Sequence, residues 1–131
     1  MVVLDSWALL AHLKDEPAAG RIESEWLESG AAISSINLGE VLYIRIRASS
    51  EDSALADVET IRRRLSVVEP DWSLVMAAAT IKANGGLSYA DAFCIATALH
   101  LSAPLWTGDP EIIDQAGEYS CEVVDLRASP A

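Results

Sequence analysis

Basic residues are scarce in this chain, and no hydrophobic run is long enough to span a bilayer. Only nine Lys and Arg face 20 Asp and Glu, so the formal net charge is −11. This charge argues against nonspecific nucleic-acid binding, which depends on phosphate neutralisation, but it does not exclude a nuclease. No apolar stretch approaches ~20 residues, and the N-terminus lacks the pattern of a signal peptide. We therefore expect a cytoplasmic protein with no membrane partner.

Cysteine and histidine are also rare. The two cysteines, Cys94 and Cys121, have no CxxC spacing and no histidine at metal-ligand spacing, so reduced structural thiols are expected. The two histidines, His12 and His100, fall on predicted helices away from the acidic motifs, and we interpret both as structural or surface residues. The composition thus gives no sign of a Cys or His metal cluster.

Apolar residues make up 51% of the 131 residues, which indicates an ordered chain and a single domain over residues 1–131. Hydrophobic runs alternate with helix signals, as in α/β folds whose parallel strands are joined by crossover helices. Strands are predicted at 2–4, 31–35, 66–68, 104–106 and 121–124, and helices at 7–13, 16–29, 37–48, 53–65, 72–83 and 88–99, with another starting at 109. Residues 128–131 are expected to be frayed.

Four carboxylates stand at or near the starts of predicted helices: Asp5, Glu40, Asp91 and Asp109. In an α/β protein, the carboxyl ends of the strands and the starts of the following helices converge on one edge of the sheet, where ligands bind. The four acids are dispersed along the chain, yet this topology would bring them together. The pattern predicts a convergent acidic pocket.

Helix capping is an alternative explanation for three of these acids, because Asp is a preferred N-cap and interacts favourably with the helix dipole. Asp109 fits an N-cap followed by Pro110 at the first helical position. Asp91 fits the third position of a capping box that starts at Ser88, and Asp5 could cap the first helix. Taken singly, each could be a cap.

Glu40 is not explained in this way. It lies in an apolar helix, three turns from any obvious cap by sequence. A partly buried Glu must be paired, protonated or bound to a cation. Arg45 is five residues away, which is a poor spacing for a helical ion pair. Glu40 therefore favours a functional role for the whole set.

Four neighbouring carboxylates also pose an electrostatic problem. Two unit charges ~4 Å apart repel by ~4 kcal/mol at an effective dielectric constant of ~20, whereas a helix N-terminus offsets only ~0.3–1 kcal/mol per acid. A bound divalent cation would offset the remainder. Ligation by oxygen alone selects hard ions such as Mg²⁺, which keep several waters.

Four segments carry a resemblance to a known family. They are Val3-Leu4-Asp5-Ser6, Ile36-Asn37-Leu38-Gly39-Glu40-Val41, Leu87-Ser88-Tyr89-Ala90-Asp91-Ala92 and Leu105-Trp106-Thr107-Gly108-Asp109-Pro110. In this order they resemble the motifs of PIN-domain ribonucleases, specifically the VapC-like toxins of toxin–antitoxin pairs. The resemblance implies a three-layer α/β/α domain with a central five-stranded parallel sheet. It also implies a metal-dependent endoribonuclease, a VapB-like antitoxin partner and a homodimer.

The resemblance also implies roles for individual residues. The catalytic and metal-binding set, for Mg²⁺ or Mn²⁺, would be Asp5, Glu40, Asp91 and Asp109, supported by Ser6, Asn37 and Thr107, although those three are also good helix caps. Arg45 and Arg47, one to two turns beyond Glu40, are candidates for holding the RNA substrate. For Trp26, Leu27 and Trp72, core packing is the preferred interpretation, and a contribution to an apolar groove for the antitoxin is the alternative.

Two other functions compete with this hypothesis. A catalytically inactive PIN-like module would bind RNA or a regulatory partner, and the intact set of four acids argues against it. A phosphatase or receiver-like α/β domain would also place acids at strand ends. Phosphatases of the haloacid-dehalogenase type need a DxD pair, and this chain has Asp5-Ser6-Trp7. Receiver-like domains need a paired acidic cluster and a downstream Lys, and neither is evident.

Overall fold

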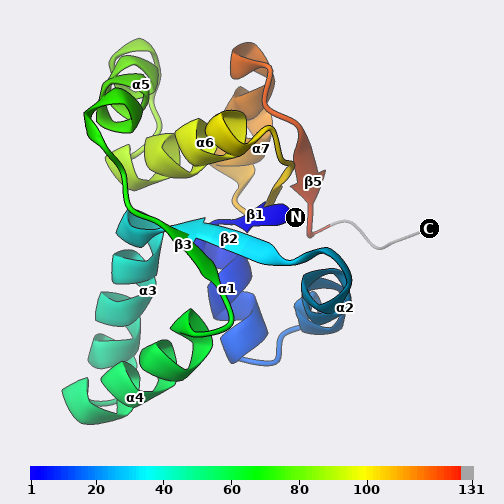
Figure 1. Cartoon of the computed structure of the whole chain (residues 1–131), viewed down its shortest axis with the longest axis vertical. Helices are drawn as coiled ribbons and strands as arrows, with labels where there is room; N and C mark the ends of the chain where they lie inside the picture. Colours follow the sequence, from blue (N-terminus) through cyan, green and yellow to red (C-terminus); the bar gives the residue numbers. More distant parts are fainter. Residues whose placement is uncertain (128–131) are drawn as a thin grey trace.

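The computed structural model describes residues 1–127, and its centre is a sheet of five short parallel strands (Figure 1). The strands are β1 (Val2–Leu4), β2 (Ala31–Ser34), β3 (Ser66–Val68), β4 (Leu105–Thr107) and β5 (Val123–Asp125), in the order β3-β2-β1-β4-β5. In the central strand, Val3 is in register with Ala32 on one side and with Leu105 on the other. The predicted five-stranded parallel sheet is confirmed.

Helices cover both faces of the sheet (Figure 1). One layer holds α1 (Ser6–Leu13), α2 (Ala19–Ser29), α3 (Ser35–Ala48) and α4 (Glu51–Arg62). The other holds α5 (Trp72–Asn84), α6 (Tyr89–Leu101), α7 (Pro110–Gln115) and the 3₁₀ turn η1 (Ala116–Tyr119). In the described part of the chain, no helix is both long and apolar enough to cross a membrane.

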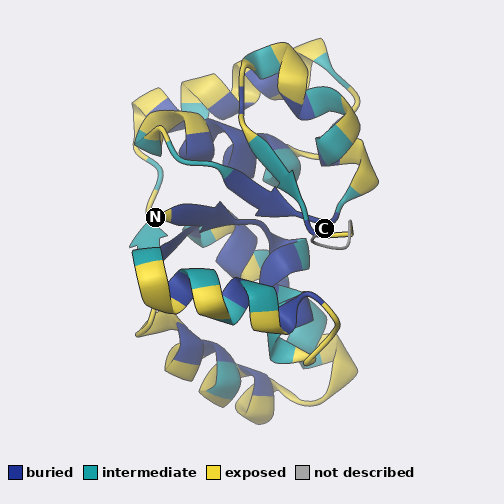
Figure 2. Ribbon diagram, turned by 90° about the vertical axis from the view of Figure 1, so that its right-hand side faces the viewer, coloured by how far each residue is buried: buried dark blue, intermediate teal, exposed yellow. Residues whose placement is uncertain are grey.

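The inner strands β1, β2 and β4 are mostly apolar because they are buried on both faces, as Figure 2 shows, whereas the edge strands β3 and β5 are only partly buried. Side chains alternate between the faces of a strand. Leu4 and Ile33 pack into the core beneath α1 to α4, whereas their neighbours Val3 and Ala32 pack into the core beneath α5 and α6. Two cores on one sheet confirm the three-layer α/β/α architecture.

The order of the strands contains a topological switch point. From β1 the chain builds β2 and β3 toward one edge, and then returns to the other side of β1 for β4 and β5. In such sheets, ligands bind outside the carboxyl ends of the strands where this reversal occurs. Here the reversal lies between β1 and β4, which lead into Asp5 and Asp109 respectively.

Several element boundaries differ from those expected. Helix α3 begins at Ser35 because the Ser34 hydroxyl caps it by accepting from the Ile36 backbone nitrogen at 3.2 Å. Glu40 is therefore the sixth residue of α3 and lies less than two turns from the N-cap. The expectation that three turns separate Glu40 from a cap was wrong.

The other boundary shifts have equally local causes. Helix α4 starts at Glu51 because Ser50 caps it, and α2 starts only at Ala19, after a turn over residues 17–18. Strands β4 and β5 end one residue later than predicted because Thr107 pairs with Asp125. The expectation of a frayed tail at 128–131 falls outside the described residues.

Candidate functional site

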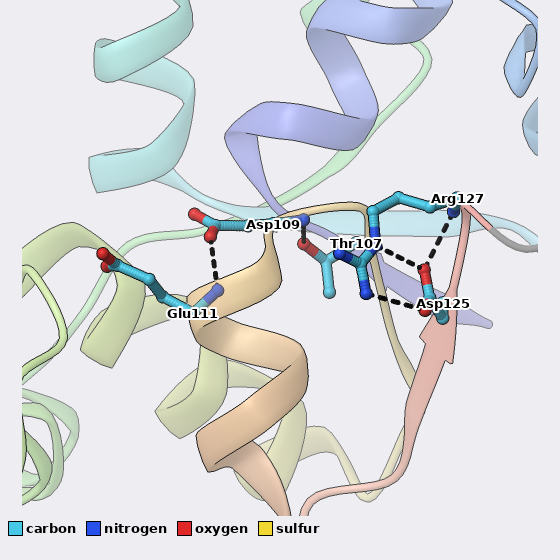
Figure 3. Close-up of polar contacts among 5 residues, drawn as sticks. All are labelled: Thr107, Asp109, Glu111, Asp125 and Arg127. Carbon is cyan, nitrogen blue, oxygen red and sulfur yellow. Dashed lines mark hydrogen bonds and ion pairs between the residues drawn. The ribbon is translucent and has the colours of Figure 1, made fainter.

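One hydroxyl joins the two strands at the switch point. Asp5 is the N-cap of α1, and its Oδ1 accepts from the Ala8 backbone nitrogen at 2.8 Å. Its Oδ2 accepts from the Thr107 hydroxyl. That hydroxyl oxygen in turn accepts from the Asp109 backbone nitrogen at 2.9 Å (Figure 3). Thr107 thus fixes Asp5 relative to the loop that carries Asp109.

Asp109 has the capping role expected of it. Its Oδ1 accepts from the Glu111 backbone nitrogen at 2.9 Å (Figure 3). Pro110 occupies the first turn of α7. At the neighbouring strand end, Arg127 Nη2 forms an ion pair with Asp125 Oδ2 at 3.1 Å (Figure 3). Because only one Asp109 oxygen is needed for the cap, the other is available to a ligand.

Glu40 and Asn37 connect α3 to the rest of the site. The Ser6 hydroxyl, at the start of α1, donates to Glu40 Oε1 and lies 3.2 Å from the Asn37 carbonyl oxygen. The Asn37 amide nitrogen donates to the Ala90 carbonyl oxygen at 3.0 Å, which ties α3 to the first turn of α6. Asp91 follows in that turn, where its backbone nitrogen is capped by Ser88 at 3.1 Å.

The carboxylates are close enough to perturb one another. The pKa of Asp5 is raised to about 7, mainly by burial and also by the charges of Asp109 and Asp91, against the lowering effect of hydrogen bonds from Thr107 and Ala8. Burial also raises the pKa of Asp91 to about 6, helped by the charges of Asp109 and Glu40. The structure therefore brings the four predicted acids to one edge of the sheet.

The donor set fits a hard divalent cation, although it is not a preformed cage. Within residues 1–127, no three Asp, Glu, His or Cys side chains lie close enough together to form a ready metal-binding group. Magnesium, however, usually takes only one or two carboxylates and keeps several waters. The buried Asn37 Oδ1 also has no hydrogen-bond partner, so one more oxygen donor is available. A cation would favour the ionised carboxylates, which burial and mutual repulsion now disfavour.

Sequence reasoning missed a contact between Trp7 and Gly108. A Cβ atom added at Gly108 would lie 2.3 Å from Trp7 Cζ2, so the indole packs directly against the glycine backbone. Gly108 separates Thr107 from Asp109, and Trp7 follows Asp5 and Ser6. Only the glycine in the Thr-Gly-Asp segment hinted at such a close approach.

The two arginines predicted to hold RNA have different surroundings. Arg45 forms an ion pair with Asp57 of α4 at 3.0 Å, and its side chain is only 22% exposed. Arg47 lies on the Tyr43 ring, with Cζ 5.0 Å from the ring centroid. Of the two, Arg47 has the freer charge.

Core packing, the preferred interpretation for Trp26, Leu27 and Trp72, is confirmed for Trp26 and wrong for the other two. Trp26 is buried in the core, and its Nε1 donates to the Arg64 carbonyl oxygen at 2.8 Å. Leu27 and Trp72 are exposed, but they belong to α2 and α5, which cover opposite faces of the sheet (Figure 1). The three residues therefore cannot line a single groove.

Among the two cysteines and two histidines, Cys94 lies beside the acids, and its thiol donates to the Asp91 backbone carbonyl oxygen at 3.0 Å. Cys94 and Cys121 are free and buried, which confirms unpaired structural thiols. His12 contacts Glu23 at 2.6 Å, between α1 and α2, and His100 is exposed near the end of α6. None of these four residues contributes a ligand to the site.

Raising the pH from about 5 to about 8 is expected to destabilise the metal-free protein through Asp5. Its pKa is about 7 in the folded protein against an ordinary 3.8, so the folded state holds a proton that the unfolded chain releases. This stabilisation is complete below pH 3.8 and is lost as the pH rises through 7. At ~1.4 kcal/mol per pKa unit, the whole loss is ~4 kcal/mol, of which ~3 kcal/mol falls between about pH 5 and about pH 8.

Urea unfolding in EDTA at several pH values measures this effect. Asp5→Asn should flatten the pH dependence, and saturating Mg²⁺ should restore stability to the wild type at about pH 8. Identical pH profiles for the wild type and Asp5→Asn would refute the assignment.

Comparisons with known proteins agree with this geometry. The family profile described as "PIN domain" matches residues 2–118. No curated protein matches the sequence. Among solved structures, DNA-bound VapBC from Salmonella typhimurium is similar at 19% identity and a TM-score of 0.76, covering 96% of this chain and 99% of the other. FitAcB from Neisseria gonorrhoeae shares 17% identity over 98% of this chain and 100% of its own, with a TM-score of 0.76.

A third similar structure is the Mycobacterium tuberculosis toxin VapC20, described as cleaving the sarcin-ricin loop. It shares 18% identity over 87% of this chain and 94% of its own, with a TM-score of 0.69. At these identities the likeness establishes a common fold over nearly the whole chain.

Proposed function

The chain belongs to the PIN-domain family, and from this we propose that it is a divalent-metal-dependent endoribonuclease toxin controlled by a small antitoxin. The observation that carries the proposal is the meeting of Asp5, Glu40, Asp91 and Asp109 at the switch point of the sheet. A structural network of helix caps would not require Asp5 to be almost fully buried beside other acids, at a cost in desolvation. A site that binds cations and phosphate accounts for that arrangement.

In this proposal the four acids hold Mg²⁺ or Mn²⁺. When bound there, such an ion would supply a water molecule of lowered pKa and positive charge to offset the charge that develops on the scissile phosphate. Ser6 fixes Glu40, Thr107 fixes Asp5 and the Asp109 loop, and Asn37 sets α3 against α6. In-line attack by water leaves a 5′-phosphate and a 3′-hydroxyl on the RNA products.

Incubating the purified protein with RNA tests this proposal. We expect internal cleavage with Mg²⁺ or Mn²⁺, loss of cleavage in EDTA, and 3′-hydroxyl product ends. Asp91→Asn should be inactive. Asp71→Asn is the matched control, because Asp71 is also a helix N-cap, accepting from the Leu74 backbone nitrogen at 2.9 Å, but caps α5 outside the acidic group. Cleavage that survives EDTA, or that Asp91→Asn retains, would overturn the proposal.

Thr107→Val is expected to lower cleavage ~10–100-fold, the usual effect of removing a group that orients a metal ligand. Valine keeps the shape of the buried side chain but can neither donate to Asp5 nor accept from the Asp109 nitrogen. Thr107→Ser should restore most of the rate. Thr97→Val is the control, since the buried Thr97 hydroxyl donates to the Phe93 carbonyl within α6. Equal rates for both valine variants would argue against the positioning role.

A second candidate is a catalytically inactive PIN-like module that binds RNA or a regulatory partner. The lack of a preformed three-ligand metal group within residues 1–127 favours this alternative. It predicts RNA or partner binding without cleavage under any divalent metal. The cleavage assay therefore distinguishes the two candidates.

The antitoxin part of the proposal rests on the similar structures, several of which are VapBC or FitAB assemblies. The net charge of −11 would complement a basic segment of such a partner. Co-expression with the product of a short upstream reading frame should give a complex in which RNA cleavage is inhibited. Light scattering of the free chain tests the predicted homodimer.

A further inference from the structure

Resting on the proposed function, we propose that Tyr43 and Arg47 form a platform for single-stranded RNA beside the acidic site. One unpaired base would stack on the Tyr43 ring, and the Arg47 guanidinium would contact the adjoining phosphate. The platform would position the strand whose phosphate enters the site, so it would contribute to binding and not to the chemical step.

The placement of the two residues on α3 supports this role. Glu40, Tyr43 and Arg47 are spaced by three and four residues, so they lie on one side of the helix. The Ser6 hydroxyl holds Glu40 at the site. The same side of α3 continues beyond Glu40 toward the C-terminal end of the helix. At 1.5 Å per residue, Arg47 lies about 10 Å from Glu40 along the helix axis. The platform thus begins where the acidic site ends.

The contacts of the pair leave it available to a ligand. Tyr43 is 45% exposed, and Arg47 Cζ lies 5.0 Å from the centroid of its ring. Across the described residues, no carboxylate is within ion-pair distance of Arg47, whereas Arg45 two residues earlier is held by Asp57. Because Arg47 is exposed and has no acidic partner, its charge is available to a phosphate.

The chemistry of the pair matches single-stranded RNA. Unpaired bases stack on aromatic rings and on guanidinium planes, and arginine adds a phosphate contact. A duplex hides its base faces and would gain only the phosphate contact. The alternative is that Tyr43 and Arg47 merely stabilise α3 as an i, i+4 pair, and the two explanations differ in their effect on RNA affinity.

Binding of a fluorescent single-stranded oligoribonucleotide, measured by anisotropy in EDTA, tests the proposal. Tyr43→Ala should weaken binding ~10-fold without changing its salt dependence, and Tyr43→Phe should retain wild-type affinity. Arg47→Ala should weaken binding and reduce the slope of log affinity against log salt by ~0.7. Arg63→Ala, which removes an equal charge from the exposed end of α4, is the control and should change little. In cleavage assays, Tyr43→Ala should raise KM and leave kcat nearly unchanged.

The possible outcomes separate this inference from the proposed function. If the wild type neither binds nor cleaves RNA, both fail. If the wild type cleaves RNA and the variants at 43 and 47 match it in affinity and KM, only the platform is overturned. Equal losses for single-stranded and duplex RNA would also overturn stacking. If the variants at 43 and 47 kept their RNA affinity but no longer bound the antitoxin or no longer formed a homodimer, this side of α3 would belong to a protein interface. That result would overturn the inference.

Discussion

Asp5→Asn is expected to lower RNA cleavage at least ~100-fold, because even orienting groups around a metal ligand cost ~10–100-fold when they are lost. The same change should stabilise the metal-free protein at about pH 8. The Asp5 carboxylate is buried beside Asp91 and Asp109, which raises its pKa to about 7, so ionising it opposes folding. Asparagine keeps the N-cap of α1 without the charge. Activity and stability should therefore move in opposite directions.

Initial cleavage rates and urea unfolding of the same preparations measure both effects. Asp71→Asn changes an N-cap aspartate of α5 that is outside the acidic group, and should leave cleavage unchanged. If Asp5→Asn lost activity only through unfolding, its stability would fall below that of the wild type. That outcome would reduce Asp5 to a structural cap.

Gly108→Ala is expected to destabilise the protein by ~1–3 kcal/mol, the usual cost of overpacking, and to impair cleavage. The new Cβ would lie 2.3 Å from the Trp7 indole, whose rigid ring can move only by displacing its neighbours. Any displacement shifts the loop that carries Thr107 and Asp109. The packing of Trp7 on Gly108 therefore affects the position of the acidic site directly.

Thermal unfolding of a mutant cycle tests the contact. Trp7→Leu should remove the clash, so the double variant should be more stable than the sum of the two single effects predicts. Gly20→Ala is the control, because a Cβ at Gly20 meets nothing within 4 Å; its stability should be unchanged or raised by up to ~1 kcal/mol. Additive effects in the cycle would show that Trp7 does not constrain residue 108.

The fold and the acidic residues could be predicted because both leave local signals. Short segments of sequence are enough to predict the buried strand at residues 2–4 and the start of α7 at Asp109 and Pro110. Helix starts were less certain, since Ser34, Ser35 and Asn37 can all cap a helix, and only the pairing of β2 with its neighbours decides among them. The ends of β4 and β5 differ from the predicted ones because they too depend on pairing between strands.

Ser6, Asn37 and Thr107 were expected to support the site, but their partners could not be predicted, because these contacts join residues far apart in the sequence. Thr107 donates to an aspartate 102 positions away, and Trp7 packs on Gly108 across a gap of nearly the same length. Spacing along one helix likewise could not show that Arg45 is held by Asp57 of the next helix while Arg47 lies on Tyr43. Such contacts depend on how the layers pack, which periodicity does not encode.

Mn²⁺ binding, counted by electron paramagnetic resonance on the purified chain, tests most directly that the four acids form a metal site. We expect the wild type and Asp71→Asn to bind Mn²⁺ alike, and Mg²⁺ to compete for the same site. Asp5→Asn and Asp91→Asn should each weaken binding at least ~10-fold. A wild type that binds no Mn²⁺, or binding that both site variants retain in full, would contradict the central claim.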